Sequence, residues 1–196
     1  MGKVLVSYFS ATGATKRLAQ KIAGVLNADI FEIKPEIKYT EDDLKWPSRN
    51  NRSCIEMKNK RFRPLVLNKL NNPEEYDEVL IGFPVWYDTA PTIVNTFIEE
   101  NNLDGKMVYI FVTSGVTSVD KSFKDLKKLY PNIKFISGKR FSGAFREKDV
   151  LNWVSWEKIL GTEQKNSGSG IFLLRPQNFH MQKKFTKNCK NIENMV

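Results

Sequence analysis

The feature that most constrains the fold of this chain is an alternation between short apolar runs and segments with helical spacing. Apolar runs of this length, separated by helices, are typical of parallel strands buried on both faces. The predicted strands are Lys3–Phe9, Asp29–Ile33, Glu78–Phe83, Lys106–Thr113 and Ile133–Ser137. The predicted helices are Thr15–Leu26, Thr92–Glu100, Ser118–Leu129 and Glu147–Leu160. Right-handed crossovers then predict a three-layer α/β fold, in which a doubly wound, five-stranded parallel sheet has strand order 2-1-3-4-5.

A long polar stretch and a change of composition set the predicted domain limits. The polar stretch from Lys34 to Asn72 predicts loop, with short helical pieces at Thr40–Lys45 and Leu65–Leu70. We expect one domain over residues 1–160. Residues 161–196 read as a flexible linker followed by an atypical basic tail, with six lysines and arginines against two acids, and we expect them to be poorly ordered.

Several function classes are disfavoured by composition. No apolar run approaches the roughly 20 residues of a membrane span, and the N-terminal run is too short for a signal peptide, so we expect a cytoplasmic protein without a membrane partner. Cys54 and Cys189 lie far apart, and His180 is the sole histidine. We therefore predict no metal site and no catalytic triad.

The turn after the first predicted strand is the first candidate site. An apolar run ends in Ser10-Ala11-Thr12-Gly13-Ala14-Thr15, and helical spacing begins directly afterwards. Backbone N–H groups and the positive end of a helix dipole meet at such a turn and suit a phosphate. The turn lacks the lysine of a P-loop and the glycines of G-x-G-x-x-G, which favours a terminal monophosphate held by neutral donors. An ordinary strand-to-helix turn with N-cap hydroxyls is the alternative.

Two further loops are expected to join this turn. Ligands of doubly wound folds bind at the carboxyl ends of the strands, where Ser10–Thr15, Pro84–Pro91 and Thr113–Ser118 should meet. The second loop contains the adjacent aromatic residues Trp86 and Tyr87, and at least one of them is expected to face a flat ligand. The alternative is that both cover the helix that begins near Thr92. The third loop has small residues that allow close backbone approach, or it simply caps the following helix.

At these residues the chain resembles the flavodoxin family. The family's phosphate loop, [ST]-x-T-G-x-T, matches Ser10–Thr15 completely. Short flavodoxin-like proteins carry a segment similar to G-[FY]-P-x-W-[WY]-G-T-x-P, which Gly82–Pro91 follows except at Asp88, where the pattern has glycine. The resemblance spans about Lys3 to Leu160 and implies FMN as the cofactor. The implied cofactor-binding residues are Ser10, Ala11, Thr12, Gly13, Ala14, Thr15, Pro84, Val85, Trp86, Tyr87, Asp88, Thr89, Thr113, Ser114 and Gly115.

Three functions follow from this reading. The first is an FMN-binding electron-transfer protein, favoured because no second nucleotide fingerprint is visible. The alternative is an FMN-dependent NAD(P)H oxidoreductase acting on quinones or similar small acceptors, and the second alternative is a non-redox binding module. Expected partners are redox proteins, or NAD(P)H with a small acceptor. The segment Lys45–Arg63 carries seven basic residues against Glu56 alone, which suits an acidic partner or a phosphorylated cofactor. We expect no nucleic acid partner, because no nucleic-acid motif accompanies the segment.

Overall fold

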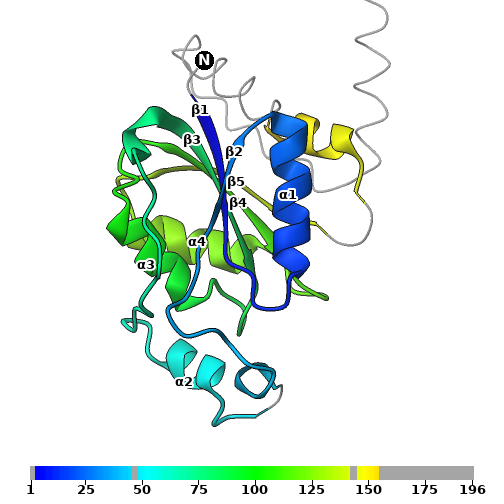
Figure 1. Ribbon diagram of the computed structural model, residues 1–196. Coiled ribbons are helices and arrows are strands. Elements are labelled where there is room, and N and C mark those ends of the chain that lie inside the picture. The colour runs from blue at the N-terminus through cyan, green and yellow to red at the C-terminus, as the bar shows by residue number, and fades with distance from the viewer. Residues whose placement is uncertain (1–2, 46–47, 142–144, 155–196) are drawn as a thin grey trace, which may run out of the picture. The chain divides into compact units, whose positions relative to one another are not determined.

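The computed structural model describes residues 3–45, 48–141 and 145–154 of the chain. Within them, five strands form a parallel sheet in the order β2-β1-β3-β4-β5 (Figure 1). This confirms the predicted fold class and strand order. The strands are β1 (Lys3–Tyr8), β2 (Asp29–Glu32), β3 (Tyr76–Pro84), β4 (Met107–Thr113) and β5 (Lys134–Arg140).

Helices cover both faces of the sheet because the strand side chains alternate between the two faces. Leu5 and Phe9 belong to the core on the face of α3 (Thr92–Glu100) and α4 (Asp120–Leu129). Val6 and Tyr8 belong to the opposite core, which α1 (Ala14–Leu26) and the helical residues 147–154 cover (Figure 1). The three predicted layers are therefore present.

The ends of the elements differ from the prediction by a few residues. α1 begins after Gly13, whose φ of 86° is left-handed, and it ends at Leu26, before Asn27 with a φ of 47°. α3 has the predicted bounds, whereas α4 begins two residues later than predicted. β5 starts one residue late and extends to Arg140, because the last residues of β4 continue to pair with Lys139 and Arg140. The predicted last helix, Glu147–Leu160, is described only as far as residue 154.

The described residues of the connection between β2 and β3 (residues 33–75, called the β2–β3 connection below) form three short helices. These are η1 (Asp42–Leu44), which confirms the predicted helical piece at Thr40–Lys45, α2 (Arg52–Lys58) and η2 (Pro73–Glu75). The predicted helix at Leu65–Leu70 is wrong. Val66 instead forms an antiparallel bridge with Pro35, and its half-buried side chain lies between the exposed Leu65 and Leu67, which is the alternation of an extended segment.

Asn68 explains why this segment is extended. Its side chain accepts a hydrogen bond from Lys34 N at 3.2 Å and donates one to Glu32 O at 2.8 Å. The amide thereby holds this segment beside the end of β2 and the residues that follow it.

A close contact between neighbouring strands distinguishes the centre of the sheet. Gly82 of β3 lies opposite Phe111 of β4, and a β-carbon at position 82 would stand 2.1 Å from the Phe111 ring. The Phe111 ring is fully buried on the face of α1. Glycine at position 82 therefore makes room for the ring.

The predicted linker and tail, residues 161–196, lie outside the described residues. Among the residues that are described, no helix has both the length and the apolar character that a membrane span requires.

Candidate functional site

A cavity of about 330 Å³ lies beyond the carboxyl ends of β1 and β3. Two of the three predicted loops contribute to its wall, and the β2–β3 connection supplies two further residues. The lining residues are Ala11, Thr12, Thr15, Leu44, Ser53, Pro84, Val85, Trp86 and Tyr87. The wall thus combines hydroxyl groups at one helix end with an aromatic surface.

The hydroxyl-rich end of the cavity is the start of α1. Gly13 N donates to Ser10 Oγ at 3.1 Å, and Arg17 N donates to Gly13 O at 3.1 Å as the first helical bond. The helix receives no side-chain cap from any described residue, and its first turn contains no acid. Its first amides consequently have no partner within the helix. Together with the Thr12 and Thr15 hydroxyls, they form a neutral donor set that suits an anion.

Trp86 stands at the base of a tight hairpin turn. Trp86 and Thr89 exchange both backbone hydrogen bonds at 3.0 Å, while Tyr87 and Asp88 have φ values of 47° and 66°. Two successive left-handed residues define a type I′ turn, which usually contains asparagine and glycine. The predicted loop therefore adopts the left-handed geometry that glycine would favour, with Tyr87 and Asp88 in its two central positions.

Tyr87 fixes this turn against α2. Burial raises the pKa of its phenol, and the side chain interacts with Ser53, Cys54 and Asn51 at the start of the helix. The strained residue is thus held by contacts outside its own turn, as strained positions generally are.

Two aromatic rings support Trp86 by edge-to-face contacts. The Phe9 centroid lies 5.4 Å from that of Trp86, and the Tyr39 centroid lies 5.0 Å away, with interplanar angles of 88° and 80°. Phe9 and Tyr39 also contact each other at 5.6 Å. Such pairs contribute roughly 0.5–1.5 kcal/mol beyond area burial. The three rings fix the plane of the indole at the cavity wall.

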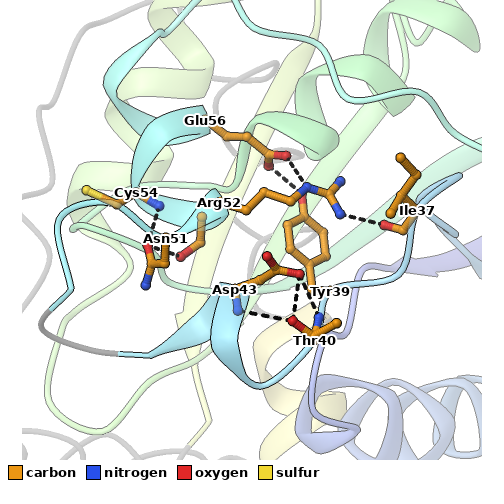
Figure 2. Close-up of polar contacts among 9 residues, drawn as sticks. Ile37, Tyr39, Thr40, Asp43, Asn51, Arg52, Cys54 and Glu56 are labelled. Atoms are coloured by element: carbon orange, nitrogen blue, oxygen red, sulfur yellow. Dashed lines mark hydrogen bonds and ion pairs between the residues drawn. The ribbon is translucent and has the colours of Figure 1, made fainter.

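Tyr39 is in turn held by a partly buried ion pair, shown in Figure 2. Its hydroxyl donates to Glu56 Oε2 at 2.5 Å, and Arg52 Nε donates to Glu56 Oε1 at 2.6 Å. The Arg52 guanidinium also lies 4.1 Å from the centroid of the Tyr39 ring. Burial and the bond to Glu56 raise the pKa of Tyr39. The phenol therefore stays protonated and keeps donating to the carboxylate.

Short-range hydrogen bonds place Leu44 and Ser53 at the cavity. Asp43 Oδ2 accepts from Thr40 N at 2.8 Å, while Asp43 N donates to Thr40 Oγ1 at 3.2 Å (Figure 2). Asn51 Oδ1 accepts from Cys54 N at 2.9 Å and so caps α2. These bonds fix η1 and the start of α2, the two elements that carry Leu44 and Ser53 to the cavity.

The third predicted loop lies beside the cavity. The Thr15 and Thr113 hydroxyls are 2.8 Å apart, and Thr113 O accepts from Val85 N at 3.0 Å. Arg140 Nη1 donates to Gly115 O at 3.1 Å, and the Ser114 hydroxyl donates to Thr117 O. The backbone N–H groups of residues 114–117 have no protein partner in the described part of the chain. The loop therefore offers donors while its acceptors are largely occupied.

The structure gathers seven of the fifteen predicted cofactor residues in the cavity wall: Ala11, Thr12, Thr15, Pro84, Val85, Trp86 and Tyr87. The other eight lie outside its lining: Ser10, Gly13, Ala14, Asp88, Thr89, Thr113, Ser114 and Gly115. Their contact with a cofactor stays a prediction. Sequence reasoning missed Leu44 and Ser53. Asn51, an N-cap residue just before Ser53, is the local signal that could have placed a helix start there.

Comparisons with known proteins agree with this architecture. The model of the family described as flavodoxin matches residues 3–157. A protein of Bacteroides eggerthii assigned as a flavoprotein is 40% identical, with a TM-score of 0.78 over 81% of this chain and 99% of its own. A second such protein, from Bacteroides uniformis, is 42% identical, with a TM-score of 0.75 over 79% and 98% of the two chains. A Lactobacillus acidophilus flavoprotein solved with FMN shares the fold at 23% identity, with a TM-score of 0.64 over 80% and 99%. No curated protein matches the chain.

Proposed function

The chain belongs to the flavodoxin family, and we propose that it binds FMN and transfers electrons between redox partner proteins. The observation that carries the proposal is the cavity itself, which joins the neutral donor set of α1 to the aromatic surface of Trp86. FMN has these same two parts, a phosphate and a wide flat ring. The FMN bound to the Lactobacillus acidophilus relative supports the choice of this cofactor.

The residues of the site fit the two ends of FMN. The Thr12 hydroxyl and the first amides of α1 would hold the phosphate, because they are donors without a competing acid in the first helical turn. The free amides of residues 114–117 would donate to the oxygen and nitrogen acceptors of the pyrimidine edge. Bound FMN supplies reversible one-electron and two-electron chemistry, which the protein tunes through these contacts.

Trp86, with the rings of Phe9 and Tyr39 that support it, would exclude water from one side of the flavin ring. Phe9 and Tyr39 contact the indole at interplanar angles of 88° and 80°, which fixes its plane without a ligand. A preformed wall lowers the cost of binding, because few side chains have to be ordered. The fixed aromatic surface also disfavours the more negative reduced ring.

An electron carrier is favoured over an NAD(P)H-dependent reductase because the sequence shows no second nucleotide fingerprint. A carrier docks its partners in turn and needs no substrate pocket of its own. As part of the proposal we place this activity in the cytoplasm, where thiols such as the buried Cys54 stay reduced.

The partner surface that we propose is acidic, and ion pairs within the described residues distinguish the basic side chains that would be available to meet it. Arg52 is neutralised by the buried Glu56, and Arg63 forms a two-bond pair with Glu99 at 2.8 Å. Arg49 and Arg61 are exposed and form no ion pair within the described residues. Docking by charge therefore rests on Arg49 and Arg61 more than on Arg52 and Arg63.

A flavin titration of the full-length protein tests the cofactor. Apoprotein should quench the fluorescence of added FMN up to one equivalent and take on the two absorption bands of oxidised flavin. Absence of any uptake, with FMN in excess and the protein folded, contradicts the proposed function.

Two further measurements separate the alternatives. NADPH and a quinone, added to the FMN-loaded protein, should not be turned over unless a separate reductase is present. Rapid turnover without one identifies the oxidoreductase instead. Salt-dependent retention on nucleic acid by a protein that takes up no flavin identifies the binding module.

A further inference from the structure

We infer that Arg140 is a positioning residue that orients the loop after β4 and raises the reduction potential of the bound flavin. The inference rests on the proposed function. Arg140 is the last residue of β5 and lies opposite Val112 in the neighbouring β4. Its Nη1 donates to Gly115 O at 3.1 Å and reaches Ser114 O at 3.5 Å. Residue 140 lies outside both flavodoxin motifs of this chain, Ser10–Thr15 and Gly82–Pro91.

The bonds from Arg140 decide which way the loop amides point. In a planar trans peptide, the C=O of one residue and the N–H of the next point in opposite directions. Because the carbonyls of Ser114 and Gly115 are drawn towards Arg140 on β5, the N–H groups of Gly115 and Val116 point away from it. The strand order places β3 on that opposite side of β4, together with the cavity residues of the Pro84–Tyr87 segment.

The remaining contacts of the loop act in the same direction. Thr113 O accepts from Val85 N, and Thr117 O accepts from the Ser114 hydroxyl. Of the carbonyls of residues 113–117, only that of Val116 has no protein donor in the part of the chain that the structure describes. The loop thus presents donors to the cavity side and presents its acceptors to Arg140 and the protein interior.

The charge of Arg140 then favours the reduced flavin. Arg140 carries a positive charge, and it forms no ion pair with an acid in the described residues. The positive charge therefore lies directly behind the amides that meet the pyrimidine edge. Reduction makes that edge more negative, so a cation there stabilises the reduced state more than the oxidised state. Asp88, on the other loop, carries the opposite charge but is exposed and more strongly screened.

Lys139 provides a matched control. It is the neighbouring residue on β5 and carries the same charge, but its Nζ donates to Asp149 O at 2.7 Å. It also lies 5.1 Å from the ring centroid of Phe141, in the core on the face of α1. Removing this charge leaves the loop after β4 untouched.

The experiment compares Arg140→Gln, Arg140→Lys and Lys139→Gln in the FMN-loaded, full-length protein. The readouts are the midpoint potential, measured by equilibration with a reference dye, and the dissociation constant of oxidised FMN. Arg140→Gln should raise the ratio of the reduced to the oxidised dissociation constant about tenfold, a fall in potential of about 30 mV for a two-electron couple. Arg140→Lys, which keeps the charge, and Lys139→Gln should each stay within about threefold of the wild type.

Three results would overturn the inference. Arg140→Gln could weaken both redox states equally, which assigns Arg140 a purely structural role. The Arg140→Gln variant could bind FMN normally and keep the midpoint potential of the wild type. Alternatively, the Lys139→Gln variant could shift the midpoint potential as much as Arg140→Gln does. A wild-type protein that takes up no FMN is a different failure, because it contradicts the proposed function itself.

Discussion

The hydroxyl of Thr15, in the first turn of α1, lies 2.8 Å from the hydroxyl of Thr113, at the end of β4. Thr15 is buried and lines the cavity, whereas Thr113 lies outside the lining. The bond therefore ties the Ser10–Thr15 turn to the end of β4, two segments that lie far apart in the chain. Thr15, a residue of the family motif, thus has a hydrogen-bond partner within the protein that does not depend on a cofactor.

Thr15→Val is expected to lower the free energy of unfolding of the apoprotein by about 1 kcal/mol, because the Thr113 hydroxyl loses its partner. Thr113→Val should cost a similar amount, and the double variant should cost less than the sum. Urea unfolding without flavin measures all three, and Thr15→Ser serves as the control that keeps the bond. Strict additivity of the two valine variants would show that the hydroxyls do not interact.

Thr12→Val tests the phosphate contact separately, because Thr12 lines the cavity and its side chain has no hydrogen-bond partner among the described residues. Hydrogen bonds to charged groups contribute about 1.5–3 kcal/mol, so FMN affinity should fall about tenfold or more. Riboflavin, which has no phosphate, should bind as before. Fluorescence titration with both flavins gives the comparison, and riboflavin is the matched control. Equal losses for the two ligands would place Thr12 away from the phosphate.

Asp88→Ala and Asp88→Gly test the strain of the hairpin turn. Asp88 has φ of 66°, where alanine is disfavoured by about 1–2 kcal/mol and glycine is not. We expect the alanine variant to be less stable than the wild type by about 1 kcal/mol and the glycine variant to be at least as stable as the wild type. Denaturant unfolding of the three proteins measures the difference. Identical stabilities for glycine and alanine would mean that the turn relaxes.

Tyr39→Phe removes one of the two side-chain donors that serve the buried Glu56 carboxylate. A buried acceptor that loses a donor costs about 1–3 kcal/mol, so the Tyr39→Phe variant should unfold at a lower denaturant concentration than the wild type. Tyr76→Phe is a matched control, because Tyr76 donates to Asp29 at 2.9 Å in an exposed position. Its expected cost is within about 0.5 kcal/mol. The prediction fails if both variants lose the same stability.

Glu99→Gln tests a pH dependence. The hydrogen bonds from Arg63 hold the pKa of Glu99 below its ordinary value of 4.5, so the folded state binds its proton less readily than the unfolded state. This stabilisation is complete above about pH 4.5 and disappears as the pH falls through the lower pKa of the folded state. The stability difference between wild type and Glu99→Gln should therefore shrink between pH 5 and pH 3.

Urea unfolding across this pH range measures the effect. Glu100→Gln is the control, since Glu100 is exposed and pairs with no described cation. A constant difference between Glu99→Gln and the wild type at all pH values would contradict the assigned ion pair.

The sheet could be predicted from sequence because its signal is local. Apolar runs such as Val79–Ile81 are buried on both faces of the sheet, so such a strand appears in the sequence as consecutive apolar residues. The ends of the strands were less predictable. Backbone hydrogen bonds between strands do not depend on side-chain polarity, so a strand can continue into polar residues. Lys139 and Arg140 extend β5 for that reason, since β4 continues to pair with them.

The β2–β3 connection was predictable only in part, because tertiary contacts determine its path. Val66 and Leu70 are four residues apart, as on one face of a helix, yet Asn68 binds the end of β2 and keeps the segment extended. Leu44 and Ser53 lie in short elements that local bonds fix, and such bonds can indicate a helix start but not that the element lies at the cavity. The contact of Arg140 with Gly115 likewise follows only from the sheet order.

The packing of Gly82 against Phe111 restricts how the centre of the sheet can change over evolution. Any larger residue at position 82 meets the aromatic ring, and any smaller residue at position 111 opens a void beside the backbone of β3. Neither position can be replaced alone without loss, so viable variants have to alter both together. We therefore expect positions 82 and 111 to covary among homologues, as a local epistatic pair next to the aromatic wall of the cavity.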